Sequence, residues 1–332
     1  MLGIGLVAAP PAANLWAQEE TAKPETSQST PFPIVDTQEV WENMTPFSQP
    51  LPTWARVFAA SLPRTTAAML RLDDLHRRHN PLGNRLANLV RWKVAVTLKC
   101  RYAIDYAEFD LETSGLTKEE IGKLANGEYS LSDEQQRCLK LAEKLTRAGY
   151  TITDEEMEAV LQELGNESAV ALVQTIAFAN FQYRLFFAVG AEVEEGGPLP
   201  SVHPWGTGND AVALPARKPL DDLYLAIPEL EYQAPPEFTQ ESIPSLVPKL
   251  KKQQQRPGRI PFPDQDHIDR LDGDEQKSAN RIKWSRVAYG YQPEMTRAWF
   301  QALRAYQQEA RPDEIFLNSV FWVVTRSNEC FY

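Results

Sequence analysis

Two cysteines at matching positions are the first candidates for chemistry in this chain. Cys100 and Cys330 occupy equivalent places in two similar stretches of sequence, and Cys138 is the third cysteine. Three cysteines do not make a disulfide framework, so we consider the matching pair for reactivity before considering a bridge. The reactive form of a cysteine is the thiolate, which forms only where its neighbours lower the thiol pKa.

The match extends well beyond the two cysteines. The shift that carries position 100 onto position 330, which we call the repeat offset, can be applied to the whole chain without gaps. It keeps a proline, two tryptophans and several other residues in step. The identical pairs are Pro63/Pro293, Thr66/Thr296, Ala68/Ala298, Asn88/Asn318, Val90/Val320, Trp92/Trp322, Val94/Val324, Cys100/Cys330 and Tyr102/Tyr332. We interpret this as an internal duplication with a complete first copy and a second copy cut off in its central helix.

The length and the net charge of the chain limit which classes of function are plausible. The 332 residues suffice for two domains, and the net charge of -11 argues against binding nucleic acid or anionic membrane surfaces. His76 and His79 share a helical face, but no cluster with metal-ligand spacing surrounds them. We therefore interpret this pair as part of a solvated face and expect no metal site.

The N-terminal part resembles an export signal followed by a linker. Residues 2–9 form an apolar run too short to span a bilayer, and Ala17 is a plausible cleavage point. No Lys or Arg precedes the run, so the alternative to a clipped signal over residues 1–17 is a flexible apolar tail. Residues 18–50, rich in Thr, Ser, Glu and Pro, predict a flexible linker. We expect an exported protein, periplasmic or extracytoplasmic, with the cytoplasm as the alternative.

Residues 51–195 predict an all-α domain, the first copy. Apolar residues recur at helical spacing from Trp54, and residues 80–83 break that pattern. A helix is expected from Asn84 to about Thr113, with Cys100 in its middle and Gly115 beyond its end. Three capping boxes predict later helix starts at Thr117, Ser132 and Thr153. The third helix is expected to end at Gly165, and Asn166 to cap a buried helix over residues 170–189.

The rest of the chain predicts a linker and the second copy. Frequent prolines over residues 196–263 exclude long helices there and predict an irregular linker. Helical patterning returns near Glu275, within a second copy assigned to residues 264–332. A truncated second copy should leave several apolar side chains uncovered, in a segment that is poorly ordered or rests on the first bundle. These side chains are Ile315, Phe316, Val320, Phe321 and Val324.

Several segments of the first copy carry a family resemblance. They are residues 100–107, 114–121, 131–134, 141–145, 152–156, 179–184 and 192–194. Together they resemble the AhpD-like superfamily, which includes alkylhydroperoxidase D and carboxymuconolactone decarboxylase. The resemblance covers about residues 54–195 and again about residues 293–332. It implies an all-α helical bundle that usually forms homo-oligomers, and it implies no cofactor.

The first copy departs from the motif of the peroxidase-like members. The helix of those members has the motif Cys-x-x-Cys-x-x-x-His, with a Glu upstream. Residues at these spacings share one helix face. The imidazole and the carboxylate can there activate a thiol as a nucleophile. Cys100 matches the first Cys, but Ala103, Ala107 and Asn88 replace the second Cys, the His and the Glu. We expect the first copy to lack dithiol chemistry, and Cys100 to be a buried structural cysteine rather than a residual reactive thiol.

The second copy carries the functional prediction. Cys330 again matches the first Cys, Asn318 replaces the Glu, and the sequence ends at Tyr332, just before the position where the second Cys would fall. We expect the protein to continue and its second repeat to act as a thiol-dependent peroxidase or disulfide reductase through Cys330. Its partners would be a small-molecule hydroperoxide and a thiol or disulfide reductant. The alternative is a non-catalytic scaffold or oligomerisation module; decarboxylase-like activity ranks third because the helix lacks the His.

Overall fold

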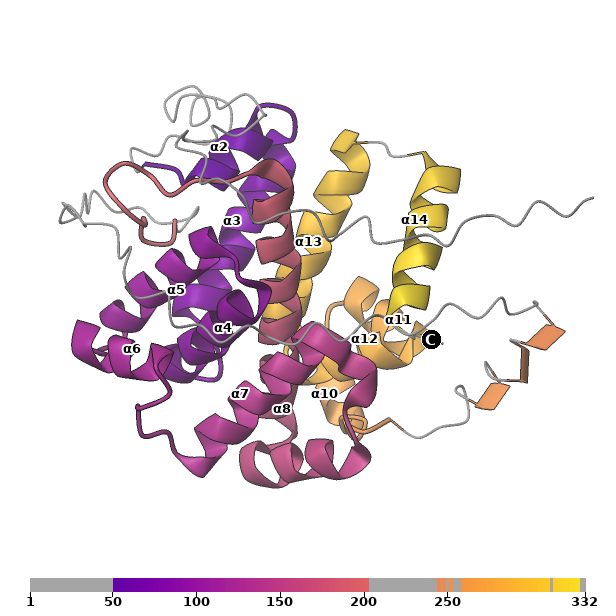
Figure 1. The fold of residues 1–332 in the computed structure, drawn as a ribbon. Coiled ribbons are helices and arrows are strands. Elements are labelled where there is room, and N and C mark those ends of the chain that lie inside the picture. The colour runs from indigo at the N-terminus through magenta and orange to yellow at the C-terminus, as the bar shows by residue number, and fades with distance from the viewer. Residues whose placement is uncertain are drawn as a thin grey trace, which may run out of the picture.

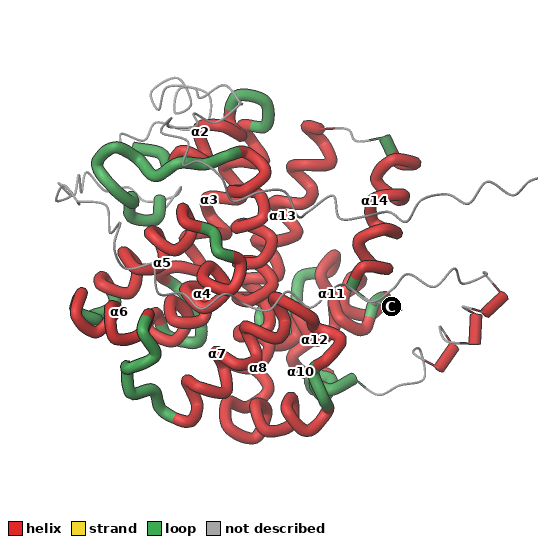
Figure 2. Tube along the Cα trace, viewed as in Figure 1, coloured by secondary structure: helices red, strands yellow, loops and turns green. Residues whose placement is uncertain are grey.

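The computed structural model describes residues 50–202, 244–245, 247–248, 251–252, 258–310 and 313–328. Every regular element within these ranges is a helix, so the all-α prediction is confirmed there (Figure 2). The predicted signal peptide and all of the first linker except Pro50 lie outside the described residues. No described helix is both long enough and apolar enough to cross a membrane.

The first bundle runs from residue 51 to residue 202 around one apolar core. Its elements are α2 (Thr53–Ala59), α3 (Pro63–Arg78), α4 (Asn84–Leu98), α5 (Arg101–Thr113), α6 (Lys118–Ala125), α7 (Asp133–Ala148), the short 3-10 helix η1 (Gly149–Thr151) and α8 (Asp154–Val189). Helix α4 is central, because α5, α7 and α8 all pack on it. Figure 1 shows these helices gathered in one body.

The three predicted capping boxes are all formed. The side chains of Thr117, Ser132 and Thr153 each accept a hydrogen bond from the third backbone amide of the helix that follows, and the residue there bonds back. These local bonds satisfy amides that a helix start otherwise leaves without partners. The starts of α6, α7 and α8 therefore follow directly from their own short sequences.

The expected break at Gly165 is present within α8. Gly165 has a φ of 74°, so the helix is kinked between its two halves. The second half is the buried one: Ala169, Leu172 and Ile176 are almost completely covered. The predicted apolar helix over residues 170–189 is thus present as the second half of one kinked helix.

The expected single helix from Asn84 to Thr113 is wrong. The chain forms two helices, because Lys99 adopts a left-handed conformation with a φ of 56° and ends α4. The backbone amide of Cys100 donates to the carbonyl of Ala95 at 3.0 Å, which closes the helix end. Cys100 therefore precedes the first residue of α5 instead of lying in the middle of a helix.

The left-handed conformation of Lys99 identifies a position where glycine should stabilise the protein. Lys99→Gly should raise the free energy of unfolding by about 0.5–1 kcal/mol, because glycine adopts a positive φ without the steric cost of a Cβ. Urea denaturation of both proteins would measure the change. The matched control is Lys140→Gly within α7, which should lower stability by about 1 kcal/mol. A destabilising Lys99→Gly would contradict the assigned end of α4.

The second region begins at residue 258 and contains α10 (Gln265–Asp269), α11 (Gly273–Arg281), α12 (Lys283–Tyr291), α13 (Pro293–Ala310) and α14 (Glu314–Ser327). Three of its helices start at a fixed distance from helices of the first bundle. The pairs of first residues are Thr53 and Lys283, Pro63 and Pro293, and Asn84 and Glu314, and the repeat offset separates the members of each pair. Helix α13 packs along α3, which joins the two regions (Figure 1).

Helix α14 has the predicted uncovered apolar side chains. Ile315 and Phe316 are 78% and 68% exposed, and Val320, Phe321 and Val324 are also exposed. The segment is nevertheless a regular helix, and it makes no extensive contact with another described helix. In Figure 1 it lies beyond α13, away from the first bundle. The expected packing of this segment on the first bundle is therefore not found.

Candidate functional site

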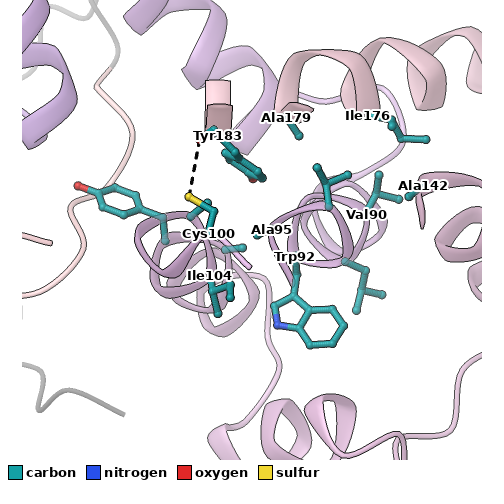
Figure 3. Close-up of a cluster of buried hydrophobic side chains, with 14 of the residues drawn as sticks. Val90, Trp92, Ala95, Cys100, Ile104, Ala142, Ile176, Ala179 and Tyr183 are labelled. Atoms are coloured by element: carbon teal, nitrogen blue, oxygen red, sulfur yellow. Dashed lines mark hydrogen bonds between the residues drawn. The ribbon is translucent and has the colours of Figure 1, made fainter. Parts of the chain in front are cut away.

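Cys100 lies in the core of the first bundle, between the end of α4 and the start of α5. Its side chain is 2% exposed, and its thiol donates a hydrogen bond to the carbonyl of Tyr183 at 3.7 Å (Figure 3). Burial raises the pKa of Cys100 to about 11, and the charge of Asp105 adds to that effect. At neutral pH this thiol stays protonated, which supports the interpretation of a structural cysteine.

The positions that would complete a dithiol relay hold no reactive groups. Ala103 and Ala107 are both completely buried in α5. Asn88 is buried too, where it donates to the carbonyl of Asp110 at 3.2 Å and accepts from Arg91 at 3.3 Å. The Asn88 amide therefore has a structural role, and none of these three residues can take a proton from Cys100.

The third cysteine is equally protected. Cys138 is buried in α7 and, like Cys100, forms no disulfide. Burial, with the nearby charges of Glu134 and Glu163, raises its pKa to about 12. The first bundle, over residues 51–202, thus presents no accessible thiol. Cys330, the other predicted catalytic residue, lies outside the described residues.

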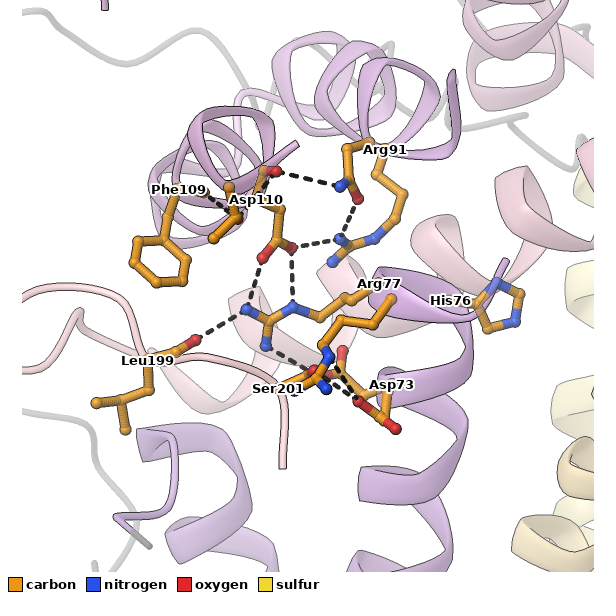
Figure 4. A network of polar contacts seen from close by, with 12 residues as sticks. Asp73, His76, Arg77, Arg91, Phe109, Asp110, Leu199 and Ser201 are labelled. Carbon is orange, nitrogen blue, oxygen red and sulfur yellow. Dashed lines mark hydrogen bonds and ion pairs between the residues drawn. The ribbon is translucent and has the colours of Figure 1, made fainter. Parts of the chain in front are cut away.

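A buried charged cluster occupies the space between α3, α4 and α5. Arg77 donates two hydrogen bonds to the carboxylate of Asp110, both of 2.8 Å, and Arg91 donates a third of 2.7 Å. Asp73 accepts from Arg77 at 3.2 Å and from Gln182 of α8 at 2.7 Å. We call Asp73, Arg77, Arg91, Asp110 and Gln182 the arginine–aspartate network (Figure 4).

The network balances its charges internally, with two guanidinium groups facing two carboxylates. Burial alone would lower the pKa of Arg77, but Asp110 and Asp73 outweigh it and raise that pKa well above its usual range. Arg77 is therefore a fixed cation, and it has no proton to exchange near neutral pH. Such an arrangement holds helices together and is poorly suited to acid–base catalysis.

The segment after α8 closes this side of the bundle. Arg77 donates to the carbonyl of Leu199 at 2.8 Å, and the hydroxyl of Ser201 donates to Asp74 at 2.6 Å. Residues 197–202 are largely buried, so the first bundle extends past the predicted start of the linker at residue 196. Linker residues 203–243 lie outside the described residues.

A second polar cluster joins the same segment to α5. Glu194 accepts hydrogen bonds from the hydroxyls of Tyr106 and Tyr102, at 2.7 and 3.1 Å, and from the backbone amide of Thr53. Burial, followed by the negative charge of Glu194, raises the pKa of Tyr106 well above its usual range. The tyrosines are therefore neutral donors that anchor the chain after α8 against α2 and α5.

The histidine pair differs from the solvated face predicted for it. His79 is half-exposed, but His76 is 2% exposed and stacks on Phe178 with 4.3 Å between ring centroids. Burial, with the positive charge of Arg91, lowers the pKa of His76 to about 3. Within the described ranges no group of three or more His, Cys, Asp or Glu side chains could hold a metal ion.

Sequence reasoning did not identify the arginine–aspartate network. A signal existed: Asp73 and Arg77 are one helical turn apart on a face that also carries Leu70 and buried apolar neighbours, and Arg91 interrupts the apolar run of α4. A charge on an apolar stripe indicates a buried partner. The identity of that partner, Asp110 of α5, depends on how the helices pack.

Comparison with known proteins does not assign this chain to a family. No protein-family model matches the chain, and a search of curated proteins finds no match.

Proposed function

We propose that this chain is a duplicated AhpD-like protein in which the first copy is a structural scaffold and the second carries thiol chemistry at Cys330. The observation that carries the duplication is the common spacing of three helices. The starts of α2 and α12, of α3 and α13, and of α4 and α14 are all separated by the repeat offset, which also separates Cys100 from Cys330. The same spacing at three helix starts is expected of a duplicated segment and is not expected of two unrelated segments.

The first copy supports the scaffold role through what surrounds its cysteine. Cys100 is buried with a raised pKa, while Ala103 and Asn88 fill positions where the family has relay groups. The arginine–aspartate network stabilises the same helices without reacting groups. Chemistry in a duplicated protein of this kind would then reside in the other copy.

The proposed reaction is peroxide reduction by a thiolate. The Cys330 thiolate attacks one oxygen of a hydroperoxide and becomes a sulfenic acid, while the O–O bond breaks and the other oxygen leaves, with a proton, as an alcohol or water. A small thiol condenses with the sulfenic acid, forming a mixed disulfide and water. A second thiol molecule then restores Cys330 and releases the oxidised disulfide.

Trapping the sulfenic acid tests this proposal on the chain as it stands. The protein is treated with hydrogen peroxide and a 1,3-dione that captures sulfenic acids, and the labelled cysteine is found by mass spectrometry. Peroxide consumption is followed in parallel with a small dithiol as reductant. We expect label on Cys330 and none on Cys100, with consumption lost in Cys330→Ser and retained in Cys138→Ser.

A non-catalytic scaffold is the second candidate. It is favoured by Asn318, because the second copy repeats the amide that serves a structural role at Asn88 in the first. Peroxide consumption no faster than in Cys330→Ser, without label on Cys330, would overturn the peroxidase proposal and support this alternative.

A further inference from the structure

The contact between α3 and α13 has an unusual register. The two helices run antiparallel: Arg64 and Thr65 at the start of α3 meet Glu309 near the end of α13. Midway along, the guanidinium of Arg71 donates to the side-chain oxygen of Gln301 at 3.0 Å, and the repeat offset separates these two residues as well. If the duplication proposed above is correct, Arg71 therefore contacts its own counterpart.

A residue meets its own counterpart only on a two-fold axis. We propose that α3 and α13 form a pseudo-two-fold interface, so that the face of α3 centred on Arg71 fits a second bundle of the same kind. Within this chain the second copy occupies that face. The two copies then associate as two identical subunits would, but inside one polypeptide.

Counterpart apolar residues flank Arg71 in α3 and Gln301 in α13. On one side Leu72 of the first copy clusters with Ala298 of the second, together with Phe178. On the other side, Ala302 belongs to the main core, and Ala68 packs against that core. Ala302 is the counterpart of Leu72, and Ala68 is the counterpart of Ala298. A two-fold relation requires such an exchange of roles between the copies.

The sequence differences between the two copies favour pairing of the two copies within one chain over pairing of α3 between two chains. The carboxylate of Glu309 accepts from the backbone amides of Arg64 and Thr65 and from the Thr65 hydroxyl, at 2.8, 2.7 and 2.6 Å. Its counterpart in the first copy is His79, which offers no carboxylate. Two chains that paired through α3 would also bring two Arg71 side chains together, and like charges repel.

The interface can be tested by disulfide trapping in the full chain. Every variant also carries Cys330→Ser, so that Cys330 cannot form a disulfide. The double variant Arg71→Cys/Gln301→Cys should form a disulfide within one chain and none between chains. Ala298→Arg, which places a charge in the buried contact, should displace the second copy and free the face of α3. Arg71→Cys added to this variant should then link two chains, because residue 71 would again lie on the axis.

Arg64→Cys, in the same displaced variant, is the matched control. Residue 64 lies at the end of α3, away from the axis, so Arg71→Cys should give about tenfold more covalent dimer. If Ala298→Arg unfolds the chain, Glu309→Arg serves instead, because it removes the carboxylate that accepts from the backbone amides of Arg64 and Thr65. Equal dimer from residues 64 and 71, or none from either while the chain stays helical, would overturn the proposal. These results do not involve Cys330, so they are independent of the peroxide assay.

Discussion

Asp110→Ala should be among the most destabilising single substitutions in the first bundle. The Asp110 carboxylate accepts three hydrogen bonds from two buried guanidinium groups, those of Arg77 and Arg91. Removing it leaves both cations without their shared counter-charge in a site that solvent does not reach. We expect a loss of about 3–5 kcal/mol in the free energy of unfolding, measured by urea denaturation.

Glu119→Ala is the matched control, because it removes a carboxylate from an exposed ion pair with Lys123 on α6. The urea midpoint of this variant should stay close to that of the parent, since exposed pairs contribute little. A small loss for Asp110→Ala, similar to that of the control, would show that the network is not buried as described.

His76→Phe should weaken the dependence of stability on acid pH. In the folded chain burial, with the charge of Arg91, holds the pKa of His76 at about 3, against 6.5 for the free side chain. Between these values the unfolded chain binds a proton that the folded chain does not, so stability falls as pH falls from about 6.5 towards 3. His76 alone would account for a loss of roughly 4 kcal/mol across that window.

The measurement is urea denaturation of parent and variant at several pH values from 7 to 4. Phenylalanine keeps a ring that can stack on Phe178 but cannot titrate, so the stability of the parent should fall more steeply than that of the variant as the pH falls. His79→Gln is the control, because it removes a half-exposed histidine close to His76 and leaves His76 in place. Parallel curves for parent and His76→Phe would show that His76 is solvated, as the sequence had suggested.

Features that depend on neighbouring residues could be predicted from the sequence. Capping boxes at Thr117, Ser132 and Thr153 placed three helix starts, because each box is a set of bonds within one helical turn. Helical periodicity predicted the all-α class. The repeat offset, visible in the sequence, also separates the first residues of α2, α3 and α4 from those of α12, α13 and α14.

Features that depend on contacts between distant segments could be seen only in the assembled fold. Lys99 lacks the glycine that usually marks a left-handed helix end, so the break before Cys100 could not be read from residue type. His76 has a polar side chain and so suggested a solvated face, yet the packing of α3 against Phe178 buries it. Asp110 is far from Arg77 along the chain, and only the packing of α5 beside α3 and α4 makes it the shared partner of Arg77 and Arg91. Burial and charge pairing are properties of the assembled helices, whereas a capping box or a helical period is complete within a single stretch of chain.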